Sequence, residues 1–219
     1  MSKLDEDIAM YALLKAGLAA PMILLFSLSL PLDAISRDFD KPVEYAPLYI
    51  SDIEPERVSS EQLEKGLEVT YYLEFFERSL EEIPKGDSSS YIVKKGDPIS
   101  EINHQFGAEE VFSSGTNRGV ALRMTGYLNL REKGEYQLQA LSNDGVVVMI
   151  DDALVISDPE QHADRLSNIG FVTIDQPGQY AVVIEYFQRK GTAALKLFWK
   201  TPGADDFVPI PADAYAHLP

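Results

Sequence analysis

The sequence contains no cysteine and few basic residues. Of its 219 residues, 35 are acidic and 19 are basic, which leaves a formal net charge of −16. The absence of cysteine excludes disulfides, thiolate nucleophiles, iron–sulfur clusters and cysteine-based zinc sites. The shortage of Lys and Arg argues against nucleic-acid binding, because phosphate backbones are held by clustered positive charge. Only three histidines are present, so a multi-histidine metal centre is not expected.

The remaining composition is that of a folded protein. Hydrophobic residues make up 45% of the chain, aromatic residues 10% and charged residues 25%. These values exclude an intrinsically disordered chain, a collagen and a coiled coil. The length fits one or two domains with a sizeable core.

Residues 10–32 form an apolar stretch in which Lys15 is the only charge. As a helix this stretch is about 34 Å long, which is enough to cross a bilayer core of about 30 Å. We therefore predict that residues 1–34 are a membrane anchor. The residues predicted to lie in the membrane as part of this anchor are Met10, Leu14, Ile23, Leu25, Phe26 and Leu32.

Two other interpretations of this segment stay open, a cleaved signal peptide and a helix that packs in a core or against another subunit. A signal peptide usually begins with basic residues, whereas this chain begins MSKLDED and is net negative there. We favour the retained anchor for that reason.

Residues 35–66 are rich in acidic residues and prolines, which is typical of a linker or an extended arm. Within this arm, Ser59 and Gln62 have the spacing of a capping box, which predicts a short helix that ends at Gly66. The apolar residues Tyr45, Leu48, Tyr49 and Ile50 are more than a bare tether needs, and they are suited to packing on a neighbour.

Residues 67–219 show short alternating apolar runs separated by turn residues, which predicts an all-β antiparallel sandwich or barrel. Two similar turns, Lys133-Gly134 and Pro177-Gly178, each precede a strand whose third residue is tyrosine, Tyr136 or Tyr180. The predicted strands are 69–75, 120–130, 134–142, 146–150, 153–156, 170–174, 178–188 and 193–200.

Seven short phrases of this region, in this order, resemble the PA14 domain family. They are Met124–Leu128, Gly134–Tyr136, Ser142–Val146, Ile150–Asp152, Ile184–Gln188, Leu195–Trp199 and Pro209–Pro211. The resemblance extends from about Gly66 to Tyr215. It implies a PA14-like β-sandwich that most often binds carbohydrate, acts outside the cytoplasm and is not itself catalytic.

The resemblance also implies a metal site. In the adhesin branch of the family, two adjacent aspartates in the loop that matches Ser142–Gly145 hold a calcium ion, which in turn holds sugar hydroxyls. Here the pair is Asn143-Asp144. Calcium takes several oxygen ligands, so an asparagine in place of one aspartate keeps an oxygen but weakens the site by one charge.

Further calcium ligands are expected from Asp151 and Asp158, with Asp152 and Asp164 as neighbours at the same end of the sandwich. The alternative is that Asn143-Asp144-Gly145 and Asp151-Asp152 are simply favourable turns.

The segment Ser157–Ser167 is the expected ligand-binding loop, with Gln161, His162 and Arg165 as ligand-binding residues. For His162, a packing role within the loop is the alternative. We expect no catalytic residues, because no nucleophile, phosphate or metalloprotease motif occurs. Trp199 is expected in the core.

Two functions follow from the sequence. The first is a membrane-anchored binding module, periplasmic or extracellular, that recognises a glycan with calcium as an optional cofactor. The second is an accessory subunit of a larger envelope assembly that binds protein rather than sugar.

Overall fold

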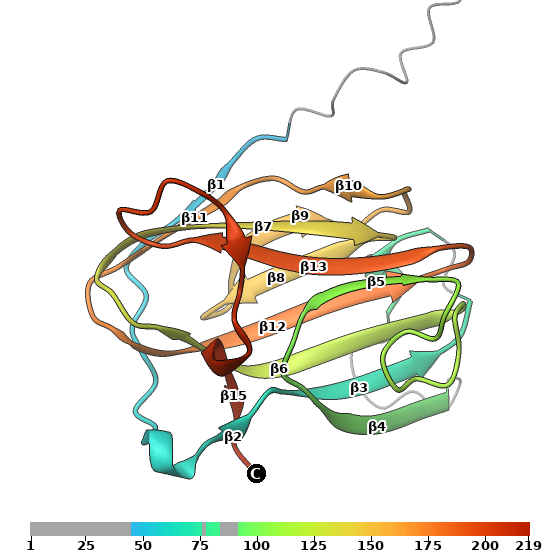
Figure 1. Cartoon of the computed structure of the whole chain (residues 1–219), viewed down its shortest axis with the longest axis horizontal. Coiled ribbons are helices and arrows are strands. Elements are labelled where there is room, and N and C mark those ends of the chain that lie inside the picture. The colour runs from blue at the N-terminus through green and yellow to red at the C-terminus, as the bar shows by residue number, and fades with distance from the viewer. Residues whose placement is uncertain (1–44, 76–77, 84–91) are drawn as a thin grey trace, which may run out of the picture. The chain divides into compact units, whose positions relative to one another are not determined.

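The structure, a computed structural model, describes residues 45–75, 78–83 and 92–219. These residues form two β-sheets and three single-turn 3-10 helices (Figure 1). The all-β fold is therefore confirmed. No helix within these ranges is long and apolar enough to cross a membrane. The predicted anchor, from Met10 to Leu32, lies outside the described residues.

One sheet has seven strands, and β7 is its organising strand because β10, β11 and β13 all pair with it. The order is β1-β11-β7-β13-β14, and β5 also pairs with β13. All pairs are antiparallel except β1 with β11. The strands are β1 (Leu48–Ile50), β5 (Asn103–Gly107), β7 (Gly134–Asn143), β10 (Arg165–Leu166), β11 (Gly170–Ile174), β13 (Ala193–Lys200) and β14 (Val208–Pro209).

The other sheet has eight strands and is entirely antiparallel. Its order is β2-β15-β6-β12-β8-β9, with β3 paired to β6 and β4 paired to β3. The strands are β2 (Glu64–Lys65), β3 (Leu67–Leu73), β4 (Ile92–Ile99), β6 (Val120–Leu130), β8 (Val146–Ile150), β9 (Ala153–Asp158), β12 (Gly178–Gln188) and β15 (Tyr215–His217).

The core is built from strands whose side chains alternate between buried and partly exposed positions. Along β12, Val182, Ile184 and Tyr186 are buried, and the residues between Val182 and Tyr186 that alternate with them are partly exposed. Burying an aliphatic side chain of this size stabilises the fold by about 1.5–3 kcal/mol. Trp199 is 7% exposed, and its ring lies 5.8 Å from that of Tyr136. The predicted core position of Trp199 is thus confirmed.

The two similar turns have a structural explanation in their tyrosines. The hydroxyl of Tyr136 accepts a hydrogen bond from the backbone N–H of Glu132 at 2.9 Å. The hydroxyl of Tyr180 donates to the backbone carbonyl of Gln176 at 2.5 Å. In both cases a buried ring reaches back four residues, so that its hydroxyl holds the turn that precedes the strand.

Part of the predicted arm belongs to the sandwich. Strand β1 pairs with β11 through Leu48↔Gly170 to Ile50↔Val172, and Ile53 is 8% exposed within the main core cluster. The prediction that the apolar residues near Tyr45 pack on a neighbour is met by the domain itself. The arm is therefore more than a linker over these residues.

The capping box at Ser59 is confirmed. Its hydroxyl accepts from the N–H of Glu61 at 3.3 Å, and Gln62 Oε1 accepts from the N–H of Ser59 at 3.0 Å. The helix that it starts is a single 3-10 turn, Ser60–Gln62, and does not reach Gly66. Leu63 is already extended, with φ −104° and ψ 139°.

Candidate functional site at the Asn143–Asp144 turn

The candidate site begins at the turn from β7 to β8. Asn143 is 7% exposed and Asp144 is 2% exposed, and the peptide bond between them is cis. A Cβ on Gly145 would lie 2.4 Å from the carbonyl oxygen of Pro159. Glycine follows Asp144 because the β9–β10 loop passes directly over this turn.

Asn143 joins several loops that are distant in the sequence. Its Nδ2 donates to Asp164 Oδ1 at 2.8 Å and to Thr192 Oγ1 at 3.3 Å. Gln105 Nε2 donates to the other oxygen of Asp164 at 2.8 Å. The hydrogen bonds from Asn143 and Gln105 hold the pKa of Asp164 below its usual value, although partial burial opposes them.

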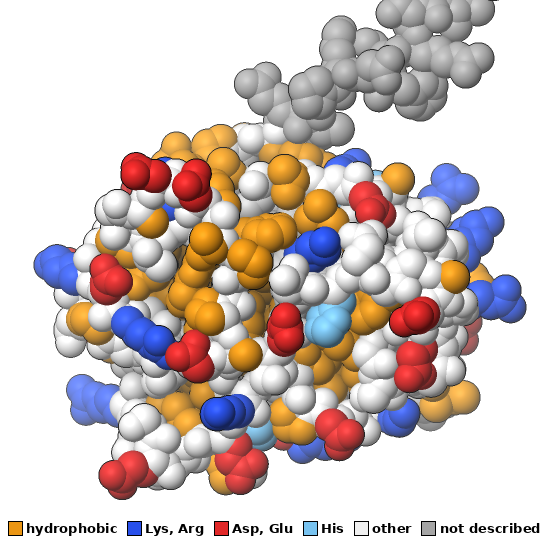
Figure 2. Space-filling model, viewed as in Figure 1, with side chains coloured by type: hydrophobic (Ala, Val, Ile, Leu, Met, Phe, Trp, Pro, Cys, Tyr) orange, Lys and Arg blue, Asp and Glu red, His pale blue; other side chains and the backbone are white. Residues whose placement is uncertain are grey.

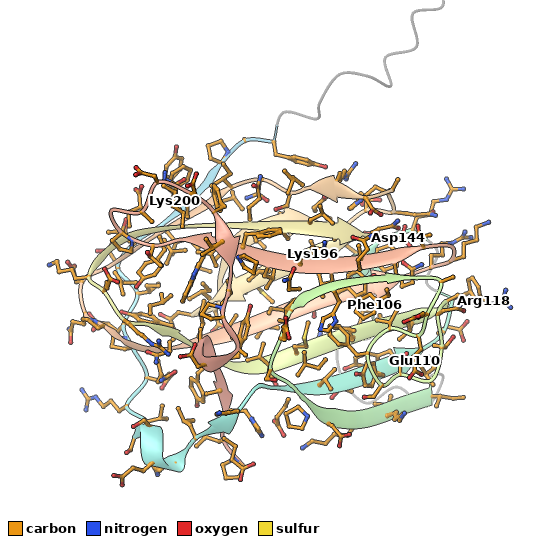
Figure 3. The ribbon with its side chains drawn as sticks, viewed as in Figure 1. Phe106, Glu110, Arg118, Asp144, Lys196 and Lys200 are labelled. Atoms are coloured by element: carbon orange, nitrogen blue, oxygen red, sulfur yellow. The ribbon has the colours of Figure 1, made fainter. Side chains whose placement is uncertain are left out.

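Asp144 is held from the opposite sheet. Its Oδ2 accepts from the backbone N–H of Arg189, just after β12, at 2.7 Å. Burial raises the pKa of this carboxyl, and that hydrogen bond only partly compensates. The turn therefore carries a desolvated carboxyl group at the end of the sandwich, where Figure 3 shows Asp144 beside the end of β7.

Gln188 adds an unpaired acceptor to the same network. Its side chain is fully buried, and its Nε2 donates to the carbonyl of Thr192 at 3.2 Å. Its Oε1 is buried and makes no hydrogen bond to any described residue. A buried amide oxygen without a partner suits a cation or an ordered water molecule.

A second cluster surrounds Asp158, the last residue of β9, whose side chain is 2% exposed. Arg165 Nε donates to Asp158 Oδ2 at 3.0 Å, and Arg165 Nη2 contacts Oδ1. His162 Nε2 lies 3.1 Å from Oδ2, and the hydroxyl of Tyr45 donates to Oδ1 at 3.2 Å. Burial favours a raised pKa for Asp158, but the close contacts with His162 and Arg165 outweigh it and lower the pKa.

The four predicted calcium residues do not come together. Asp151 and Asp152 form the two-residue turn between β8 and β9, with φ of 50° and 60°. They lie at the far end of β8 from Asp144, and the five residues of that strand alone span about 16 Å at 3.3 Å per residue. The expectation that Asp151 shares an end with Asp144 is therefore wrong, and the turn interpretation of Asp151-Asp152 holds. Asp158 lies near the turn, but its oxygens face Arg165, His162 and Tyr45.

The three predicted ligand-binding residues lie in the β9–β10 loop and at the start of β10, but two of them face inward. His162 and Arg165 both pair with Asp158, and the side chain of His162 is only 5% exposed. The packing alternative for His162 describes this geometry. Gln161 is half-buried, and its backbone N–H donates to the carbonyl of Arg78 at 2.8 Å.

The network also includes residues that sequence reasoning did not single out, namely Gln105, Gln188 and Thr192. Gln105 lies on β5, a strand that the sequence pattern did not predict. Gln188 and Thr192 flank the turn from β12 to β13, where nothing in the residue order indicates a site. Only the pairing of β13 with β7 and β5 brings them to Asn143.

No group of three or more Asp, Glu or His side chains within residues 45–75, 78–83 and 92–219 is arranged around a common point as metal ligands are. A cation at this turn would therefore depend on amide oxygens as well as carboxylates. Four side chains at this turn have oxygens that could coordinate a cation. They are the amides of Asn143 and Gln188 and the carboxylates of Asp144 and Asp164.

A sequence model of the PA14 domain matches residues 63–213, which is more than half of the chain. The chain belongs to the PA14 domain family. No curated protein sequence matches this PA14 protein.

Solved structures share the fold at low sequence identity. The PA14 domain of the MpAFP antifreeze protein has a TM-score of 0.58 at 13% identity, covering 75% of this chain and 96% of that domain. The A domain of epithelial adhesin 6 from Candida glabrata has a TM-score of 0.59 at 15% identity, covering 74% and 89%.

An anti-sigma factor domain-containing protein from Clostridium clariflavum has a TM-score of 0.54 at 19% identity and is covered over 47% of its length. This PA14 protein thus spans about half of that relative.

Proposed function

We propose that this PA14 domain is a non-catalytic glycan-binding module whose site is the turn at Asn143 and Asp144. The observation that carries the proposal is the convergence of buried or hydrogen-bonded polar groups from β5, β7, the β9–β10 loop and the β12–β13 turn. Sugar hydroxyls need fixed donors and acceptors of this kind, because a preordered site loses little entropy on binding.

The similarity to an adhesin supports the same proposal. The A domain of epithelial adhesin 6 was solved in complex with Galβ1-3GlcNAc. At 15% identity the likeness concerns the fold, so the sugar that this chain binds is a separate matter. The proposal therefore names glycans as a class and no individual sugar.

Calcium is part of the proposal. The residues that would hold it are Asn143, Asp144, Asp164 and Gln188, and the unpaired Oε1 of Gln188 is the feature that fits a cation best. Bound calcium supplies a hard positive centre that coordinates sugar hydroxyls. The protein's own contribution is to fix these oxygens at the end of a rigid sandwich.

We further propose that residues 1–34 anchor the module in a membrane and that the sandwich is periplasmic or extracellular. The apolar stretch at residues 10–32, which is long enough to cross a bilayer as a helix, supports this arrangement.

A glycan array tests the proposed function, with the full chain applied in the presence of calcium and again with EDTA. We expect saturable binding to a defined set of glycans, loss of that binding in Asp144→Ala, and weaker binding with EDTA. Asp152→Ala is the matched control, because it removes the same charge from the turn at the far end of β8. Binding that survives Asp144→Ala would exclude this turn as the site.

A structural role in an envelope assembly is the second candidate, and the exposed ring of Tyr49 favours it. Tyr49 is 70% exposed on the edge strand β1 and stacks on Phe171 with ring centroids 4.8 Å apart. An aromatic pair at a sheet edge suits a protein partner. Cross-linking of membranes from cells that produce the full chain, with Tyr49→Ser as comparison, tests this alternative.

A further inference from the structure

A groove lies beside the Asp144 turn, at the end of β3. Its volume is about 380 Å³. Its lining residues are Leu73, Glu74, Phe75, Thr116, Arg118 and Gly119. Asp144 is not one of them, so the groove is a feature separate from the turn.

Arg189 connects the groove to the turn. Its backbone N–H donates to Asp144 Oδ2 at 2.7 Å, and its carbonyl accepts from the N–H of Gly119 at 2.9 Å. Arg189 therefore lies between the carboxyl group of Asp144 and Gly119, which lines the groove. A ligand that occupies the turn can therefore extend past Arg189 towards the groove.

The groove combines an aromatic surface with a cation. Phe75 is 47% exposed, and the guanidinium carbon of Arg118 lies 5.7 Å from its ring centroid. Arg118 is exposed and makes no salt bridge to a described residue. Glycine at position 119 leaves room for the ring, since a Cβ there would come within 3.0 Å of Phe75.

Basic residues lie at this groove even though the whole chain is acidic, and Glu74 is the one acidic residue among its lining residues. Although the chain has a net charge of −16, Arg118, Arg189 and Lys190 lie next to one another at this end. The Nε of Arg189 is buried and has no hydrogen-bond partner among the described residues. Figure 2 shows Lys and Arg side chains at the right-hand end of the molecule, where Figure 3 places Arg118.

We propose that this groove is a second sugar subsite, and that it accepts a carboxylate-bearing sugar residue linked to the sugar at Asp144. The inference rests on the proposed glycan binding. The apolar face of the sugar ring packs on Phe75, and the Arg118 guanidinium donates two parallel hydrogen bonds to the carboxylate. Glu74, whose Oε1 already accepts from the N–H of Phe75 at 2.8 Å, accepts from sugar hydroxyls beside that ring.

The test uses an array of glycan pairs whose members differ only by a terminal sialic or uronic acid. We expect the full chain to bind the acidic member about tenfold more tightly, as a charge-assisted hydrogen-bonded contact provides. Arg118→Gln removes this preference and leaves binding of the neutral member unchanged. Arg57→Gln, which removes the same charge from an exposed position in the arm, keeps the preference.

Arg118→Lys and Phe75→Ala separate the two contacts. Arg118→Lys retains the charge but loses the two-point geometry, so part of the preference remains. Phe75→Ala weakens binding of the acidic glycan in particular, because the additional sugar ring of that glycan no longer has an aromatic surface to pack on. Thermal melts of each variant verify that the fold is intact, since Arg118 and Phe75 are both exposed.

Three results would overturn the subsite. If the neutral and acidic members bind equally, the subsite is wrong and glycan binding at Asp144 stands. If Arg57→Gln loses the preference as Arg118→Gln does, the effect is general electrostatics. If no glycan of either kind binds, the proposed function and the subsite fail together.

Discussion

Arg165 and Asp158 form a two-point ion pair that joins the start of β10 to the end of β9. Arg165 Nε donates to Asp158 Oδ2 at 3.0 Å, and Nη2 contacts Oδ1. The Arg165 guanidinium also lies 5.4 Å from the ring centroid of Tyr45, whose hydroxyl donates to the same carboxylate. The loop above the Asn143–Asp144 turn is therefore held by a buried charge and by the arm.

Removing Arg165 should destabilise the domain. In Arg165→Met the Asp158 carboxylate, with a side chain only 2% exposed, loses its main counter-charge. Since Arg165 is 31% exposed, we expect a loss of about 2 kcal/mol in the free energy of unfolding, below the range for fully buried pairs. Urea-induced unfolding of the variant and of the unaltered chain measures this loss. Arg131→Met is the control, because the exposed Arg131–Asp213 pair should contribute about 0.5 kcal/mol or less.

The same ion pair predicts a loss of stability in acid. The pKa of Asp158 is lower in the folded state than in the unfolded chain. Its stabilising contribution is complete above the unfolded pKa of about 3.9 and disappears as the pH falls through the folded pKa. Asp158→Asn should therefore reduce the unfolding free energy at pH 7 by more than at pH 3. A reduction of equal size at both pH values contradicts the assignment.

Asp144 should behave in the opposite way. Its folded pKa is raised by burial, so its contribution to stability is present below the unfolded pKa and is lost as the pH rises through the folded pKa. At pH 7 the charged carboxyl then opposes folding. Asp144→Asn, which keeps an oxygen for the N–H of Arg189, should raise the unfolding free energy by up to about 1 kcal/mol and weaken glycan binding. A lower melting temperature for this variant would count against a strained binding site.

Gly145→Ala should damage both the fold and the site. The new Cβ would lie 2.4 Å from the Pro159 carbonyl oxygen and 2.7 Å from the Phe187 ring. The backbone at residue 145 or at Pro159 would therefore have to shift. We expect a loss of about 2–4 kcal/mol in thermal or urea unfolding. Gly203→Ala is the comparison, since Gly203 has φ +77° but open space, and backbone strain alone costs about 1 kcal/mol. Equal effects would show that the close approach of Pro159 does not constrain residue 145.

The arm should contribute to the stability of the domain. Ile53→Ala removes a side chain that is 8% exposed and should reduce the unfolding free energy by about 2–4 kcal/mol. Tyr49→Ala removes a ring that is 70% exposed and should cost less than about 1 kcal/mol. If the two variants have the same melting temperature as the unaltered chain, residues 45–62 act only as a linker.

The strands with clear alternation could be predicted from the sequence. Strands β6, β8, β11, β12 and β13 have the predicted bounds, because each buries one face against the core. Strand β4 was not predicted, since its first four residues, Ile92–Lys95, are exposed on both faces and show no alternation. Strand β5, with the sequence NHQFG, is too polar and short to stand out.

The turn at Asn143-Asp144 was also predictable as a candidate site, but most of its partners were not. Asp164, which the sequence did suggest at this end, accepts from Asn143. Gln105 and Thr192, which it did not suggest, are tens of residues away in the sequence. Thr192 accepts from Asn143, and Gln105 donates to Asp164. Asp151, in contrast, is near in sequence and far in space, because the intervening strand β8 is extended. Short sequence separation was a poor guide to the ligand set.

The sequence by itself determined the all-β class, the PA14 family, most strand positions and the location of the turns, because these depend on local alternation and on residues that tolerate special backbone angles. The tertiary structure decided that Asp158 pairs with Arg165, that the arm forms β1, and that Phe75 and Arg118 share a groove beside Asp144. Those outcomes depend on which strands lie next to each other. Strand neighbours are chosen by the packing of the whole core, so no local pattern in the chain records them.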